Sequence, residues 1–238
     1  MRKSISLFLL AALAALALGG CVRTLRPARW NYIPQTPPAV AAPLLNRTIA
    51  VVAFADERAS FNQDLLALQF IPIWPFGWQN YYLPELADFH LNSGRWYFEP
   101  TRDLAQAMAA ELRNARLFAQ VVYTDQPVDA DFLLEGRLLS TRYTGYQISY
   151  GLSVLAPAVW ALGAPSGQVS NEIEIEMRVR DLATGAVSWR GTFALGRGTP
   201  VWVYDDRDDF FYHVLFGQIA REAVAHMRET FQAAVAAR

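Results

Sequence analysis

Few residues of this 238-residue chain have the types and spacing that catalysis or metal binding requires. His90, His213 and His226 lie far apart in the sequence, and a single cysteine is present, so a zinc site is not expected. The segment 151–155 lacks the final glycine of a serine nucleophile elbow, and the segment 196–198 lacks the Lys-Ser/Thr of a phosphate loop. The sequence therefore predicts neither an enzyme nor a bound metal or cofactor.

Two groups of acidic residues remain as candidates. Asp205, Asp206, Asp208 and Asp209 could bind calcium through their oxygens, but their spacing does not match an EF-hand loop. Such residues also cap helices and stabilise the positive end of the helix dipole, and we favour that interpretation. Three glutamates alternate over residues 172–176, and we expect them to meet arginines across a hairpin or to face water.

The lone cysteine, Cys21, ends a secretory signal. Arg2 and Lys3 precede an apolar run over residues 5–18, and the segment closes as Leu18-Gly19-Gly20-Cys21. A run of about 14 residues is too short to span a bilayer, which needs about 20. An ordinary secretory cleavage site with an incidental thiol is the other alternative, and the absence of any further cysteine argues against it.

The four residues that end at Cys21 resemble the lipobox of bacterial lipoproteins. That resemblance implies acylation of the thiol, cleavage that removes residues 1–20, and a stable membrane anchor, because two or three acyl chains hold firmly. Val22 follows in place of an aspartate, and by the same resemblance this sorts the protein to the periplasmic face of the outer membrane.

Composition narrows the class of partner. Loss of Arg2 and Lys3 with residues 1–20 changes the formal net charge from −1 to −3, so nothing suggests nucleic-acid binding. With Cys21 acylated, no disulfide can form within the mature chain. The fold must therefore be held together by its core.

A tether is expected between the anchor and the domain. Residues 21–46 contain five prolines and no apolar periodicity, and such a segment could reach about 75 Å if it were fully extended. Trp30, Tyr32 and Ile33 could instead dock part of it on the domain. Residues 47–238 are then expected to form a single periplasmic domain.

Apolar patterns within residues 47–238 predict five strands and two main helices. The strands are expected at residues 49–54, 118–123, 131–143, 172–180 and 187–193, and the helices begin at Thr101 and near Asp208. Strict alternation over residues 172–180 indicates a half-exposed antiparallel strand. The predicted fold is α+β, with a mixed, largely antiparallel sheet of about five strands and both helices packed on one face.

Two aromatic-rich insertions, residues 59–98 and 145–169, interrupt this pattern and are expected to meet at one end of the sheet. They either form extra core or expose an apolar surface for a protein partner or a membrane interface, where Trp and Tyr concentrate. The residues proposed for this surface are Phe70, Trp74, Phe76, Trp78, Tyr81, Tyr82, Tyr150 and Trp160.

A broader resemblance covers residues 46–236. The buried first strand and the segments Leu117–Val121, Ala130–Gly136 and Asp181–Trp189 resemble a group of envelope proteins. The group includes the amino-terminal domain of the Tol-system translocation protein, the lipoprotein activator of penicillin-binding proteins, the curli-secretion lipoprotein and the auxiliary lipoproteins of ABC transporters. The resemblance implies a shared fold and function by binding other envelope components, without catalytic residues.

Two functions are consistent with these features. The first is a non-catalytic outer-membrane lipoprotein that binds another envelope protein. The alternative is a lipid-handling or membrane-inserting auxiliary component of a transport or secretion system, which the aromatic insertions favour. The sequence does not indicate an oligomeric state.

Overall fold

The computed structural model describes residues 27–126, 129–204 and 209–237. Its α-helices are α2 (Pro100–Ala115), α3 (Ala156–Ala161) and α4 (Tyr212–Ala236). Short 3₁₀ helices are η1 (Leu66–Phe70), η2 (Pro84–Leu86) and η3 (Ser153–Leu155). The strands are β1 (Ala28–Arg29), β2 (Leu45–Val51), β3 (Ala55–Asp56), β4 (Asn62–Asp64), β5 (Phe76–Tyr81), β6 (Trp96–Tyr97), β7 (Phe118–Tyr123), β8 (Phe132–Ser140), β9 (Tyr143–Ile148), β10 (Gly167–Asp181) and β11 (Val187–Val201).

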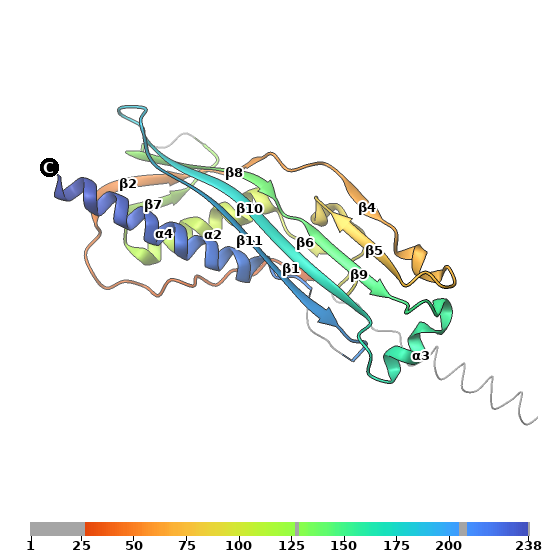
Figure 1. Cartoon of the computed structure of the whole chain (residues 1–238). Helices are drawn as coiled ribbons and strands as arrows, with labels where there is room; N and C mark the ends of the chain where they lie inside the picture. Colours follow the sequence, from red (N-terminus) through yellow and green to blue (C-terminus); the bar gives the residue numbers. More distant parts are fainter. Residues whose placement is uncertain (1–26, 127–128, 205–208, 238) are drawn as a thin grey trace, which may run out of the picture.

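Strand β10 is a central strand of a nine-stranded mixed sheet (Figure 1). It pairs antiparallel with β11 along its full length on one side, and with β9 and then β8 on the other. Beyond β8 the sheet continues through β2 to β7 in parallel pairs, while beyond β9 it continues through β5 to β4 in antiparallel pairs. β1 and β6 form a separate parallel pair.

The prediction of about five strands and two main helices is wrong, although the α+β class holds. The insertions themselves supply β4, β5 and most of β9, and they lengthen β10. In β5 the usual alternation is inverted, because Gly77 and Gln79 are buried while Phe76 and Trp78 are only half-buried. A strand that buries its polar positions gives no apolar alternation for sequence reasoning to detect.

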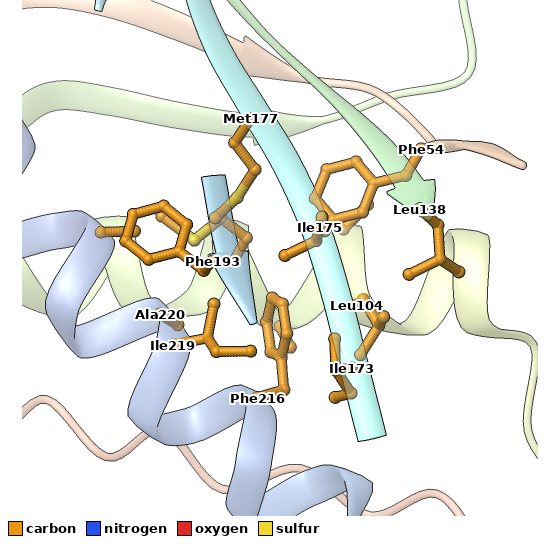
Figure 2. Packing of buried hydrophobic residues seen from close by; sticks show 14 of the residues in the cluster. Phe54, Leu104, Leu138, Ile173, Ile175, Met177, Phe193, Phe216, Ile219 and Ala220 are labelled. Atoms are coloured by element: carbon orange, nitrogen blue, oxygen red, sulfur yellow. The ribbon is translucent and has the colours of Figure 1, made fainter. Parts of the chain in front are cut away.

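The expected alternation in β10 is present and positions the main core. Ile173, Ile175, Met177 and Val179 are fully buried, and Figure 2 shows the first three facing apolar side chains of α2 and α4. Helix α2 begins at Pro100 rather than Thr101, and proline is suited to the first position of a helix because its missing N–H would be unpaired there anyway.

Residues 28–44 lie along the helices rather than away from the domain (Figure 1). Trp30 stacks on Phe98 with ring centroids 5.1 Å apart, as the docking alternative for the tether predicted, whereas Ile33 stays 69% exposed. The buried carboxylate of Glu111 in α2 holds this segment. It accepts hydrogen bonds from the Tyr32 hydroxyl and from the backbone N–H groups of residues 35 and 36, the latter two at 2.6 and 2.9 Å.

A second buried carboxylate fixes the first insertion to the start of α4. Asp209 accepts hydrogen bonds from the Tyr143 hydroxyl at 3.0 Å, the Ser93 hydroxyl at 2.5 Å and the backbone N–H of Asn92 at 3.0 Å. His90 stacks on Trp96 beside this group, with centroids 3.7 Å apart. Burial lowers the pKa of His90, against the raising effects of the Gly94 carbonyl and Asp209, so this imidazole is neutral near pH 7.

We predict that Glu111→Ala lowers the free energy of unfolding by about 2–3 kcal/mol, because three hydrogen bonds to a charged acceptor are lost. The variant should also be cut faster by protease between residues 30 and 44. Chemical denaturation and limited proteolysis measure the two effects. Glu222→Ala, on the exposed side of α4, is the matched control and should change stability by less than about 0.5 kcal/mol. Equal behaviour of the two variants would contradict the assigned role of Glu111.

Candidate functional site

The eight aromatic residues proposed from the sequence differ in exposure. Phe70, Trp74 and Tyr150 are exposed, at 57%, 43% and 41%. The half-buried residues are Phe76, Trp78 and Tyr82. The buried residues are Tyr81 and Trp160, at 4% and 8%. Some of these side chains are therefore accessible from solvent, while others belong to the interior.

Tyr81 and Trp160 hold the insertions to the sheet. The Tyr81 hydroxyl donates to Asp64 at 2.6 Å, and its ring stacks on Tyr143 with centroids 5.8 Å apart. The Trp160 indole N–H donates to the carbonyl of Ile148 at 2.8 Å. Neither ring is available to a partner in this conformation.

The two insertions meet at one end of the sheet, which confirms that expectation. β5 of the first pairs antiparallel with β9 of the second. Beyond these strands, the N–H of Ile73 donates to the carbonyl of Gly151 at 3.0 Å, and the Ser153 hydroxyl donates to the carbonyl of Phe70 at 2.5 Å. Residues 66–75, 149–164 and 201–204 together form what we call the apical tip, at the end of the molecule marked by α3 in Figure 1.

The apical tip is apolar and lies in uncharged sequence. Its exposed apolar and aromatic side chains are Phe70, Ile71, Ile73, Trp74, Tyr150, Leu152, Val154, Leu155, Leu162 and Tyr204. Residues 65–84, 143–171 and 198–204 contain no Asp, Glu, Lys or Arg. Contiguous exposed apolar surface of this kind marks a contact with a protein or a membrane. Within the described part of the chain, no helix is both long and apolar enough to cross a bilayer.

Backbone strain concentrates at the apical tip. Ile73, Tyr150 and Ser153 have φ values of 72°, 56° and 53°, and they are three of the four non-glycine residues with positive φ among those described. Ile73 is the least expected, because a β-branched side chain is disfavoured in the left-handed region. Its side chain is 88% exposed, so packing in the protein does not compensate for the strain. Strain kept at an exposed site points to a functional role for the conformation.

Other acidic and polar candidates have structural partners or lie outside the described residues. Glu172 pairs with Arg142 at 3.1 Å and Glu176 with Arg137 at 3.0 Å, but these arginines belong to the β8 side of β10 and not to the expected hairpin. Across the hairpin, Glu176 lies 3.6 Å from Arg190 of β11, which is the arrangement that was expected. Cys21, Asp205, Asp206 and Asp208 lie outside the described residues. Across residues 27–126, 129–204 and 209–237, no three His, Cys, Asp or Glu side chains gather closely enough to hold a metal ion.

A second surface feature lies at the end of the molecule opposite the apical tip, beside the C-terminal turns of α4 (Figure 1). This distal groove has a volume of about 570 Å³ and includes Leu45, Phe132 and Phe231 among its apolar lining residues. An Arg47–Asp131 ion pair of 2.6 Å lies in its lining. Sequence reasoning missed it, because Phe132 and Phe231 fit the core faces of a strand and a helix, and the lining comes from separate segments.

We predict that Ile73→Gly raises the free energy of unfolding by about 1 kcal/mol, because glycine adopts positive φ without strain and little buried surface is lost. Ile71→Gly is the matched control. Residue 71 has φ of −76° and a side chain that is 49% exposed, so glycine there should destabilise by about 0.5–1 kcal/mol. Chemical denaturation measures both. Destabilisation of similar size in the two variants would show that residue 73 is not strained.

Comparisons with known proteins give a likeness of fold. No protein-family model and no curated protein matches the sequence. Among solved structures, protein XCC0632 of family DUF330 from Xanthomonas campestris aligns with a TM-score of 0.51 at 13% identity, over 87% of this chain and 98% of that one. This likeness shows the fold alone.

Two dodecameric crystal structures of PelC from Paraburkholderia phytofirmans are more distant. One, a point variant, aligns at 14% identity over 82% of this chain and 92% of that one, and the other aligns at 15% over 80% and 90%. Both have TM-scores of 0.34, too low to support a structural argument. These structures are not the Tol-system, penicillin-binding-protein-activator or curli-secretion proteins that the sequence resembles.

Proposed function

We propose that this protein is a non-catalytic envelope lipoprotein that is held in the outer membrane by acyl chains on Cys21 and binds another envelope protein. The proposal draws on the lipobox-like segment, on the absence of a catalytic constellation in the sequence, and on two separate apolar surfaces at opposite ends of the described structure. Binding at surfaces of this kind requires no reactive group, only complementary shape and polarity.

The direction of the docked N-terminal segment carries the proposal. The described chain begins at Pro27, six residues after Cys21, and six residues span at most about 20 Å. From β1 the segment runs toward the C-terminal end of α2, where the N–H of Leu44 donates to the carbonyl of Arg116 at 3.1 Å. It therefore leads away from the apical tip (Figure 1). An anchor at Cys21 would hold the tip end near the membrane and leave the distal groove facing the periplasm.

The distal groove is the surface that we assign to the protein partner. Its volume of about 570 Å³ lies within the range of sites that accept a ligand-sized group, such as apolar side chains of a partner helix or loop. Leu182, Val187 and Val235 are exposed by 43%, 46% and 48%; two of them line the groove and Val187 precedes a third lining residue. Arg47 and Asp131 supply polar groups that could fix the partner's orientation.

A second candidate is the membrane-inserting auxiliary component, which the apical tip favours. Ten exposed apolar or aromatic side chains in uncharged sequence fit a lipid interface as well as they fit a protein. The two candidates are compatible, since the two surfaces lie at opposite ends of the molecule.

We predict that Cys21→Ala abolishes labelling by radioactive fatty acid in growing cells and leaves an uncleaved precursor. The physical reason is that the acylated thiol is removed, and lipoprotein cleavage follows acylation in the family that the segment resembles. Gel mobility and membrane fractionation measure the change. Leu182→Ala, at the distal groove, is the control and should be labelled and processed normally. Fatty-acid labelling that persists in Cys21→Ala would overturn the anchor.

We predict that a photoreactive amino acid at Leu182 or Val235 forms a discrete crosslinked band with one envelope protein in living cells. Mass spectrometry identifies the partner. Val40, which is 99% exposed in the docked N-terminal segment and outside the groove, is the control position and should give no such band. The same band from Val40, or no band from either groove position, would contradict the groove as the partner surface.

A further inference from the structure

The outer face of the sheet, opposite the helices, changes in polarity along its length. Nearest the apical tip it is aromatic. Trp74, Phe76 and Trp78 form a continuous run with successive ring centroids 6.2 and 5.9 Å apart, and Tyr146 of β9 contacts Phe76 at 6.0 Å. This run joins the exposed apolar side chains of the tip to the strands.

Farther from the tip, the same face is polar and uncharged. Asn80 of β5 lies opposite Thr144 of β9, which lies opposite Ser170 of β10. Gln63 of β4 lies opposite Asn80 on the other side. Directly opposed residues share a face, so these amides and hydroxyls form one row across four strands.

On this face, the charged side chains lie beyond the polar row, farther from the apical tip. Arg142 pairs with Glu172 at 3.1 Å, then Arg137 with Glu176 at 3.0 Å, and Arg178 with Glu135 at 3.0 Å. Phe76, in the aromatic run, begins β5, and Tyr82, at the level of Arg142, directly follows this strand. At about 3.3 Å per residue the interval between these two residues is about 20 Å. The order along the face is thus apolar, aromatic, neutral polar and charged.

We infer that the apical tip is seated in the interface of the same membrane that holds Cys21, with the long axis of the sheet upright. This inference rests on the proposed anchor. The order of polarity matches the order met on leaving a bilayer, where acyl chains give way to a headgroup zone enriched in Trp and Tyr and then to water. Ile73, Val154, Leu155 and Leu162, each at least 66% exposed, are the side chains placed among the acyl chains.

The covalent connection selects the membrane over a protein as the occupant. Six residues connect Cys21 to Pro27 and can span at most about 20 Å, and the segment that follows Pro27 runs away from the tip. Acyl chains on Cys21 would therefore bring lipid to this end of the molecule at high effective concentration. The tip then acts as a second membrane contact beside the acyl anchor, and it prevents the domain from rotating freely on its short connection.

The sequence makes a direct test possible, because Cys21 is the only cysteine and acylation consumes it. The full acylated protein carrying Leu162→Cys or Val154→Cys can be labelled with an environment-sensitive fluorophore and reconstituted into phosphatidylethanolamine–phosphatidylglycerol vesicles. Spin-labelled phospholipids then report depth by quenching the fluorophore. Leu182→Cys, at the distal groove, is the matched control because it is exposed, apolar and at the opposite end.

We predict quenching at positions 154 and 162 that exceeds quenching at position 182 by about twofold or more, with a blue-shifted emission at the two tip positions. Adding Ile73→Asp should reduce quenching at position 154, because a carboxylate is driven out of the acyl region. Equal quenching at the tip and at position 182 would overturn the inference. Fluorophore labelling of the parent protein, which has no introduced cysteine, would instead show that Cys21 is free, and the anchor itself would fail.

Discussion

The pairing of β10 is the interaction on which the rest of the structure depends. Residues 167–180 of this strand pair with β11, with one register shift between Val179 and Arg180, and the strand also pairs with β9 at one end and β8 at the other. One part of the strand buries Ile173, Ile175 and Met177 against the helices. The part nearest the tip, residues 167–171, pairs with β9, most of which comes from the second insertion, and with the end of β11. A single strand thus joins the helix-covered core to the apical tip, and relative motion of the two would break its ladder.

Two buried carboxylates complete this arrangement from outside the sheet. Glu111 holds the N-terminal segment on the helices, and Asp209 holds the first insertion at the start of α4. Each accepts three hydrogen bonds from partners distant in sequence, and this compensates for the cost of removing the group from water. Together they set where the chain enters the domain and where the aromatic insertion lies. If Cys21 is acylated as proposed, these contacts set where the anchored end of the chain joins the domain.

The functional proposals follow from the separation of the two surfaces. An uncharged, strained, apolar tip lies at one end, and a groove with an apolar floor and an ion pair lies at the other. A protein anchored near its tip would present the groove to the periplasm at a defined height and angle. Such an arrangement suits an adaptor, which contributes position and complementary surface rather than chemistry. The likeness to protein XCC0632 concerns the fold alone and assigns no activity.

The sequence by itself determined the elements whose pattern is local. Alternation over residues 172–180 located β10, helical periodicity located α2 and α4, and the aromatic-rich insertions identified the region of the tip. Periodicity of apolar residues reveals a helix or strand when one face of that element is buried and the other is exposed. These helices and this strand are buried in that way. Phe70 and Trp74, two of the residues predicted for a partner or membrane surface, are exposed in the structure.

Only the tertiary structure decided the remaining features, because they depend on contacts between distant segments. β5 buries Gly77 and Gln79 against groups from elsewhere in the chain, so its strand character was invisible and the count of strands was too low. Tyr81 and Trp160 became interior through single hydrogen bonds to Asp64 and Ile148. The lining of the distal groove includes Phe132 and Phe231, which come from a strand and a helix and have ring centroids 5.8 Å apart. The sequence around each of these residues does not reveal such a contact. The periodicity of one strand or helix shows which of its faces is buried, but not which distant segment will pack against that face.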